Sequence, residues 1–351
     1  MSLASLGWDP TLAFLFDELC DELQRDDLIA GRVVRQDRGL LLVGTERGVV
    51  RARPAPSLDA AFVVGDWLAL EPRDDQHALI RGLLPRKSLL ERKRPGERAA
   101  GQAMAANVDV AFWVAPVDRD VSLRGIERAL TLLYESGASP VVVLSKADLA
   151  EDLAALVLDV ERVALGVPVL PWSATDGRGR DEIEAQLGAG RTGALLGPSG
   201  AGKSTLVNAL LGEERFETGR VRVRDLKGRH TTTHRELVTL AHGGLLVDGP
   251  GVRELGLLSD EGMGEAFPDV EALSEGCHFS DCSHEHEPGC AVRRALLEGI
   301  LDEDRLQSFF KLKKEVAFLE RQTSASAQRA QKAKARQLSL AVRRVTRDKG
   351  R

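Results

Sequence analysis

The chain has 351 residues, of which 43% are hydrophobic and 29% charged, and its formal net charge is −5 at pH 7. This is the composition of a globular protein, and the length suits about two or three domains. No apolar run approaches the roughly 20 residues of a membrane span, and residues 1–10 lack the regions of a signal peptide. We therefore expect a cytoplasmic protein without membrane contacts.

The first 85 residues predict a helix followed by a small barrel. Residues 1–28 carry four apolar residues at helical spacing, which indicates a helical extension: Leu12, Leu15, Phe16 and Leu19. Residues 29–85 hold short β-rich runs between turns with Gly, Asp or Pro, at 31–34, 40–43, 48–50 and 62–64. Strands this short and regular predict a barrel. An OB-type barrel, a fold that often binds oligonucleotides, fits the length, and an SH3-like barrel fits nearly as well.

After a basic linker at residues 86–102, strands and helices alternate. Residues 123–135 fit a helix, and continuous apolar runs indicate buried strands at 108–117, 140–144, 167–172, 191–196 and 244–247. This alternation predicts a doubly wound parallel sheet, which we assign to a domain of residues 103–264.

The strongest local motif is a phosphate-binding loop, which matches G-x-x-x-x-G-K-[ST] at every position. Together with the next residue it comprises Gly197, Pro198, Ser199, Gly200, Ala201, Gly202, Lys203, Ser204 and Thr205. The glycines let the backbone curve around phosphate with its N–H groups inward. Lys203 would reach the β- and γ-phosphates, and Ser204 would hold Mg²⁺. A predicted strand before the loop and a helix after it argue against a chance Gly-rich turn.

Two further segments fit the phosphate end of such a site. Asp248 follows a predicted strand and begins the pattern D-x-x-G, which ends at Gly251. The aspartate can hold Mg²⁺ through water, although the pattern alone also describes many turns. Between the motifs, Thr232 lies in the run 228–233. It could complete the Mg²⁺ shell only when γ-phosphate is present, as in an order–disorder switch.

A guanine-binding motif is predicted at Ser145-Lys146-Ala147-Asp148, which resembles the N-K-x-D motif of GTPases. Asp148 can accept hydrogen bonds from N1–H and the exocyclic amine of guanine together, and adenine offers no such pair of donors. The stem of Lys146 would lie along the base plane. Ser145 replaces the usual Asn, which predicts a weaker supporting hydrogen bond. Ser173-Ala174 resembles the second guanine-contacting loop.

The order of these motifs is permuted, because the base motifs precede the phosphate loop. Circular permutation is physically permissible where chain ends lie close together. With this order the chain resembles the RsgA (YjeQ) family of circularly permuted GTPases over nearly its whole length, including the runs 105–109, 228–233 and 248–253. The resemblance implies a late-stage assembly factor of the small (30S) ribosomal subunit. Such a factor binds rRNA, and the subunit stimulates its hydrolysis of GTP to GDP. We expect a monomer.

Hydrolysis is predicted to be slow without a partner. Many GTPases orient the attacking water with a Gln just after D-x-x-G, and Val252 occupies that place. We expect His230 to orient the water once the ribosome orders its loop. The alternative is that His230 is an ordinary solvated loop residue.

A cysteine cluster near the C-terminus predicts a metal site. Cys277, Cys282 and Cys290 fall within fourteen residues, with His284 and His286 as competing fourth ligands. Three thiolates and one imidazole favour structural Zn²⁺. The C-x4-C-x-H-x5-C pattern of the resembled family selects His284. The alternative is a set of buried free cysteines beside surface histidines. We assign residues 265–351 to a zinc-binding helical domain.

Charge separates the tail from the rest of the chain. Residues 321–351 hold ten Lys or Arg and one acid, Asp348, so this tail is about +9 on a body of about −14. With one acidic partner in the tail, RNA contact is favoured over a solvated helical face.

Three functional classes fit these motifs. The first is a GTP hydrolase that acts on the small subunit. The second is a P-loop ATPase or kinase, which Asp148 and the permuted order disfavour. The third is a guanine-nucleotide-dependent RNA-binding module with little turnover, which Val252 keeps open.

Overall fold

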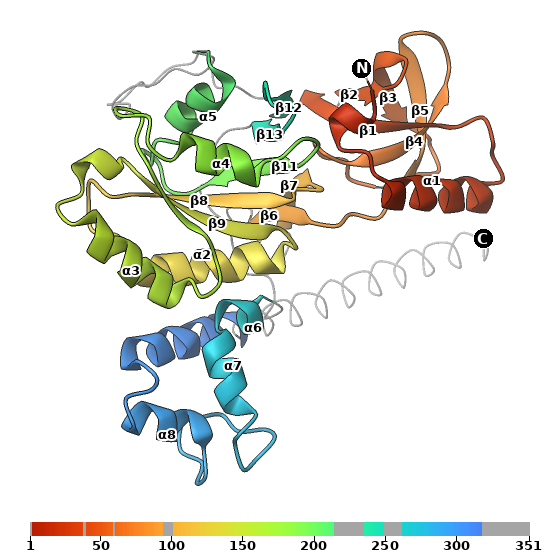
Figure 1. The fold of residues 1–351 in the computed structure, drawn as a ribbon. Coiled ribbons are helices and arrows are strands. Elements are labelled where there is room, and N and C mark those ends of the chain that lie inside the picture. Colours follow the sequence, from red (N-terminus) through yellow and green to blue (C-terminus); the bar gives the residue numbers. More distant parts are fainter. Residues whose placement is uncertain are drawn as a thin grey trace, which may run out of the picture.

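The computed structural model describes residues 2–37, 40–58, 60–93, 101–213, 235–248 and 262–317. They form a barrel, a larger mixed sheet between helices, and a C-terminal helical lobe (Figure 1). No helix within these ranges is long and apolar enough to cross a membrane.

The N-terminal segment covers the barrel with a short 3₁₀ turn, Ala4–Leu6, and helix α1, Pro10–Leu23. Asp9 caps α1, because its carboxylate accepts a hydrogen bond from the Leu12 N–H at 2.8 Å, and Pro10 occupies the first helical position. The apolar face of the helix packs against the barrel residues Trp67 and Leu84. The helix expected within residues 1–28 is therefore present.

The barrel consists of five strands: β1 (Ile29–Asp37), β2 (Leu40–Thr45), β3 (Gly48–Pro54), β4 (Trp67–Pro72) and β5 (His77–Leu83). They follow the order β1-β2-β3-β5-β4, and β4 pairs with β1 to close the barrel. Only the pairing of β3 with β5 is parallel. This closed arrangement is the OB-type barrel rather than the SH3-like one.

One predicted strand of the barrel is wrong. Residues 62–64 are buried but form no strand, and Val64 makes only an isolated bridge with Ala105. Strands β4 and β5 supply the closure instead. The side chains of Phe62 and Val64 fill the barrel core while the backbone of residues 62–64 runs outside the ladder.

A buried arginine joins the N-terminal segment, the barrel and the larger sheet. The Arg32 side chain donates hydrogen bonds to the carbonyl oxygens of Leu6 at 2.5 Å, Gly65 at 3.2 Å and Asn107 at 3.0 Å. Its guanidinium also lies 5.3 Å from the centroid of the Trp67 ring. Burial lowers the pKa of Arg32 to about 10. The residue is only 2% exposed, so these carbonyls must replace its hydration.

The larger sheet has six strands: β8 (Val110–Pro116), β9 (Ser139–Ser145), β10 (Val169–Trp172), β11 (Thr192–Leu196), β12 (Arg235–Thr239) and β13 (Leu245–Asp248). Their order is β10-β9-β8-β11-β13-β12, and every pair is parallel except β12 with β13. All five predicted strands are present, although β10 is only partly buried except at Trp172. Strand β12 was not predicted, and it pairs with β1 so that the sheet continues into the barrel.

Helices cover both faces of this sheet, as expected for a doubly wound fold. Helices α2 (Leu123–Glu135) and α3 (Leu153–Val163) pack on one face, and α4 (Arg180–Gln186) and α5 (Lys203–Leu211) on the other (Figure 1). A short antiparallel pair, β6 (Leu89–Lys93) and β7 (Gly101–Ala106), occupies part of the predicted linker.

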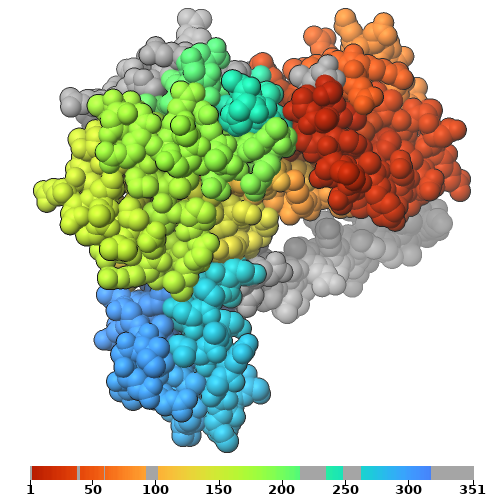
Figure 2. Space-filling view, viewed as in Figure 1, coloured from red at the N-terminus to blue at the C-terminus, as the bar shows by residue number. Residues whose placement is uncertain are grey.

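The C-terminal lobe contains α6 (Met263–Ala266), α7 (Pro268–Ser274), α8 (Ala291–Leu297) and helical residues 303–317. It projects from the α2 side of the sheet as a separate mass (Figure 2). Even so, its apolar residues form one core with those of α2 and α3.

Arg305 anchors the lobe to the sheet domain. Its guanidinium donates to Glu127 of α2 at 2.8 Å and to Asp269 of α7 at 2.9 Å. It also donates to the Ala266 carbonyl at 2.9 Å and lies 4.3 Å from the centroid of the Phe267 ring. The side chains of Arg305 and Glu127 are 4% and 2% exposed. Removing one member of such a buried pair leaves the other charge uncompensated.

We therefore expect Arg305→Ala to lower the free energy of unfolding by about 3–5 kcal/mol, measured by urea denaturation. The matched control is Arg124→Ala, because Arg124 forms an exposed pair with Asp304 at 2.6 Å. That change should cost less than about 1 kcal/mol. Equal effects of the two variants would show that the Arg305 network does not anchor the lobe.

Candidate functional site

The predicted nucleotide motifs meet at one edge of the sheet. Strands β8, β9, β10 and β11 run parallel, so their carboxyl ends share this edge. The phosphate loop follows β11, and Ser173 follows β10. The guanine motif starts at Ser145, the last residue of β9. Open parallel sheets bind ligands beyond the carboxyl ends of their strands.

The side chain of Lys203 folds back onto the phosphate loop. The ammonium of Lys203 donates to the carbonyl oxygens of Gly197 and Pro198, each at 2.7 Å. Gly197 has φ of 133°, and a Cβ there would lie 2.3 Å from the Val114 carbonyl oxygen. A larger residue would thus displace the loop from the strand. Ser204 and Thr205 lie in the first turn of α5, whose positive end faces the loop.

Ser145 ties the guanine motif to the phosphate loop. Its hydroxyl donates to the Ala201 carbonyl at 2.7 Å and lies 3.4 Å from the Ala115 carbonyl, and the residue is fully buried. The sequence predicted a weaker supporting bond from serine than from asparagine. The hydroxyl nevertheless makes a short hydrogen bond directly to the phosphate loop.

Asp148 is held for hydrogen bonding by the loop after β10. Its carboxylate accepts from the Ser173 hydroxyl at 2.6 Å and from the Thr175 hydroxyl at 3.3 Å. The Ser173 hydrogen bond contributes most to lowering the pKa of Asp148, so the acceptor stays ionised. Ala147 is buried beneath the motif, and Ala174 lies between the two hydroxyl residues. The predicted guanine residues are therefore brought together.

Three residues near the motifs were not predicted: Asp118, Arg119 and Thr175. Lys146 forms an ion pair with Asp118, and Arg119 donates to the Ser199 carbonyl at 3.3 Å. These residues lie in loops, where no periodicity marks them. The only sequence signal is their position just after a strand that ends at the same edge.

The remaining predicted residues are not placed by the structure. His230, Thr232, Gly251 and Val252 lie outside the described residues. Asp248 ends β13 at the edge shared with the phosphate loop, but its side chain is not described.

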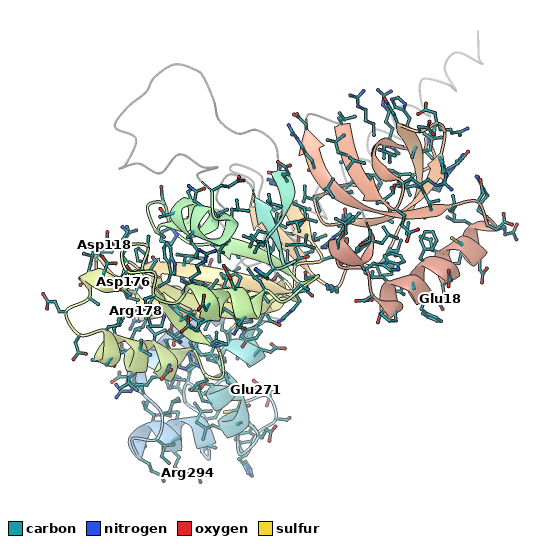
Figure 3. The ribbon with its side chains drawn as sticks, turned by 45° about the horizontal axis from the view of Figure 1, so that its top comes forward. Glu18, Asp118, Asp176, Arg178, Glu271 and Arg294 are labelled. Atoms are coloured by element: carbon teal, nitrogen blue, oxygen red, sulfur yellow. The ribbon has the colours of Figure 1, made fainter. Side chains whose placement is uncertain are left out.

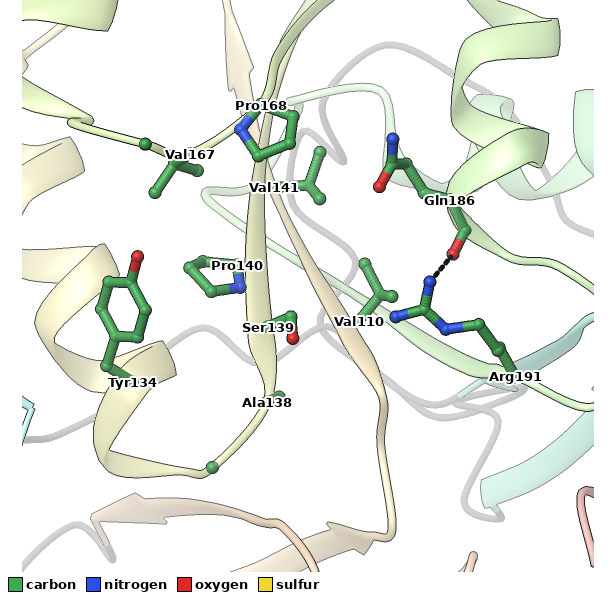
Figure 4. A pocket seen from close by; sticks show the side chains of 12 residues that line it. Val110, Tyr134, Ala138, Ser139, Pro140, Val141, Val167, Pro168, Gln186 and Arg191 are labelled. Carbon is green, nitrogen blue, oxygen red and sulfur yellow. Dashed lines mark hydrogen bonds between the residues drawn. The ribbon is translucent and has the colours of Figure 1, made fainter. Parts of the chain in front are cut away.

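A cavity of about 360 Å³ lies at the opposite edge of the sheet (Figure 4). Val110 and Ser139, the first residues of β8 and β9, line it together with Tyr134 and Arg191. Arg191 donates to the Gln186 carbonyl at 3.0 Å. This cavity is separated from the nucleotide motifs by the length of the strands.

The cysteine cluster converges in the C-terminal lobe. The ligand atoms of Cys277, Cys282, His284 and Cys290 all lie within 4.8 Å of one another. The Cys277 and Cys290 sulfurs are 3.9 Å apart, and they lie 3.6 and 3.5 Å from Nδ1 of His284. Tetrahedral zinc bonds predict about 3.8 Å between sulfurs and about 3.6 Å from sulfur to nitrogen. The four residues therefore fit a zinc site. His286 is exposed and lies outside the cluster.

We expect Cys282→Ser to abolish metal binding and to loosen the C-terminal lobe, because a structural metal contributes directly to folding. His286→Ala is the control, and it should keep about one metal per chain. Elemental analysis of the two purified variants measures the difference. Equal metal content in both would contradict the assigned ligand set.

We expect Asp148→Asn to reduce the preference for GTP over other purine nucleotides, because an amide cannot accept both guanine hydrogen bonds. Competition of GTP, XTP and ATP against a fluorescent nucleotide measures this preference. Asp176→Asn is the control, since Asp176 lies in the neighbouring loop and pairs with Arg178. An unchanged preference in Asp148→Asn would exclude the aspartate from base recognition.

Comparison with known proteins agrees with this geometry. The model of the RsgA GTPase family matches residues 83–258. The model of the ABC transporter family matches residues 181–344, which include the phosphate loop but neither guanine motif.

Relatives match over most of their length. The small ribosomal subunit biogenesis GTPase RsgA of Streptomyces coelicolor is 46% identical, over 93% of this chain and 90% of that protein. The protein of the same name from Syntrophotalea carbinolica is 39% identical, over 100% of this chain and 99% of that protein. The crystal structure of YjeQ from Thermotoga maritima superimposes with a TM-score of 0.64 at 28% identity, and covers 83% of this chain and 99% of that one. The chain therefore belongs to the RsgA family of circularly permuted GTPases.

Proposed function

We propose that this GTPase acts in the cytoplasm as a late-stage assembly factor of the small ribosomal subunit, and that the subunit stimulates its GTP hydrolysis. The observation that carries the proposal is the permuted sheet, in which Ser145 joins the guanine motif to the phosphate loop at 2.7 Å. The names of the relatives, which specify small-subunit biogenesis, support the choice of partner.

We propose that GTP lies along the carboxyl edge of the sheet. Its phosphates bind the loop residues 197–205, and its guanine binds Asp148 beside Ser173 and Ala174. Ser204 and Asp248 would hold Mg²⁺, the aspartate through water, and Thr232 would become a further ligand when γ-phosphate is present. The ion would neutralise charge on the phosphates. The Lys203 and Asp148 hydrogen bonds support this orientation of the nucleotide.

We propose that the protein is a monomer whose flanking domains hold rRNA. Its division follows the predicted bounds: an extension at 1–28, the barrel at 29–85, a linker at 86–102, the GTPase domain at 103–264 and a zinc domain at 265–351. On β3, exposed Val49, Arg51 and Arg53 alternate with buried residues, so two arginines face outward from the barrel. The basic tail adds a second cationic element.

We propose that the cysteine cluster binds one structural Zn²⁺ per chain. All four positions are filled by protein ligands, which leaves no open coordination site for catalysis. The buried Cys290 is also the N-cap of α8, so the metal would fix the start of that helix. The zinc thus stabilises the lobe that Arg305 joins to the GTPase domain.

The test is GTP hydrolysis by the purified protein with and without purified small subunits, with ATP in parallel. We expect the protein alone to hydrolyse GTP slowly, because Val252 cannot orient water. The subunit should stimulate hydrolysis of GTP, but not of ATP, at least about a hundredfold. Lys203→Ala should abolish binding. GTP binding without stimulation would contradict the role in subunit assembly.

His230 is the residue proposed to orient water in the stimulated state. His230→Ala should therefore lose the stimulation while GDP affinity stays near that of the unsubstituted protein. His242→Ala is a control, because His242 lies in a turn after β12 and does not belong to the predicted switch run 228–233. Normal stimulated turnover in His230→Ala would end this part of the proposal.

A further inference from the structure

Residues 117–121, between β8 and α2, reach both halves of the nucleotide site. They belong neither to the guanine motif nor to the phosphate loop. Asp118 forms an ion pair with Lys146 of the guanine motif, and Arg119 donates to the Ser199 carbonyl of the phosphate loop. Figure 3 places Asp118 at the same end of the GTPase domain as Asp176 and Arg178, which follow the second guanine loop.

The contact between Asp118 and Lys146 fixes a side chain that would otherwise be mobile. Both side chains are about one-third exposed, so the pair adds little to stability. Its effect is positional, because a free lysine loses much rotamer freedom when it is ordered against a ligand. Asp118 holds the ammonium of Lys146 before the base arrives. It therefore qualifies as a positioning residue.

Arg119 brings positive charge to the phosphate loop. Its Nη2 donates to the carbonyl of Ser199, the third residue of that loop, at 3.3 Å. A guanidinium has five N–H donors in a planar fork that suits phosphate oxygens. Within the described part of the chain, no ion pair with a carboxylate occupies Arg119. Among the described residues, the other N–H donors of Arg119 are therefore open to an anionic ligand.

We propose that residues 117–121 form a third nucleotide-binding segment, in which Asp118 positions Lys146 against the guanine base and Arg119 donates to the phosphates of GTP. This rests on the nucleotide placement proposed above. In hydrolysis, a bond forms from the water oxygen to the γ-phosphorus, and the bond from that phosphorus to the β–γ bridging oxygen breaks. The leaving GDP oxygen takes the electron pair, and the proton lost by the water passes to an oxygen of the released phosphate. Arg119 stabilises that developing charge more than it stabilises bound GTP.

The experiment compares Asp118→Ala, Arg119→Ala and Arg119→Lys in the full-length protein. Arg162→Ala is the matched control, because Arg162 is an exposed arginine of α3 whose side chain is 77% exposed and pairs with Asp159. Affinities for fluorescent GDP and for a non-hydrolysable GTP analogue are measured. Single-turnover hydrolysis at saturating GTP is followed alongside.

Asp118→Ala should weaken the affinities for GDP and for the GTP analogue by the same factor, about three- to tenfold. It should leave the rate of hydrolysis at saturating GTP unchanged. Arg119→Ala should keep GDP affinity within about twofold and lower the saturated rate at least about tenfold. Millimolar guanidinium should restore part of that rate in Arg119→Ala only. Arg119→Lys should show an intermediate rate, because it keeps charge but loses the fork.

Wild-type affinity in Asp118→Ala together with a wild-type rate in Arg119→Ala would overturn the proposal. So would an Arg119→Ala variant that loses GDP affinity without any change in saturated rate, because Arg119 would then only brace the loop. Lys203→Ala distinguishes failure of the third segment from failure of the proposed nucleotide site. If it abolishes binding while Asp118→Ala and Arg119→Ala behave as wild type, the third segment is wrong and the nucleotide site stands. If it still binds GTP, the proposed nucleotide site itself is wrong.

Discussion

The nucleotide site depends on the register of the parallel strands β8, β9 and β10. Ser145 is level with Pro116 on one neighbouring strand and with Trp172 on the other. The guanine motif, the segment after Pro116 and the loop that starts at Ser173 therefore leave the sheet at one level. That common level is set by hydrogen bonds between neighbouring strands and not by the order of the strands along the chain. A permuted sequence can thus build the same site, provided that the strands pair in the same spatial order.

The same sheet also fixes the flanking parts of the protein. On one side, β12 pairs with β1, and Arg32 adds hydrogen bonds that join the barrel to the strand connection at Asn107. On the other face, Arg305 joins the C-terminal lobe to α2. Both arginines are buried, and each is satisfied by several partners, so each junction has a defined hydrogen-bonded geometry.

The parallel strands, the strand–loop–helix position of residues 197–205 and the convergence of three cysteines with His284 could be predicted because each leaves a local mark: a continuous apolar run, a glycine pattern or a cysteine spacing. Features that depend on contacts between residues far apart in the sequence could not be predicted. Residues 62–64 are as apolar as a strand, yet Phe62 and Val64 fill the barrel core without joining a ladder. Strand β12 is short and partly exposed, and it is recognisable only from its pairing with β13 and β1. The Ser145 bond to Ala201 and the contacts of Asp118 and Arg119 join residues far apart in sequence, which a motif search does not connect.

Binding and hydrolysis make different demands on this architecture. The groups proposed to recognise guanine and phosphate are already held by hydrogen bonds: Asp148 accepts from Ser173 of the loop after β10, and Lys203 donates to carbonyls of its own phosphate loop. Such preorganised contacts stabilise bound GTP and the transition state alike, so they raise affinity without raising the rate at saturation. Val252 removes the usual means of orienting water. Extra stabilisation of the transition state must therefore come from groups beyond the strand ends. Arg119 can supply charge from within the chain, whereas alignment of the water requires an ordered His230. Under the proposed function, such a protein would bind GTP by itself and hydrolyse it quickly only once its partner orders His230.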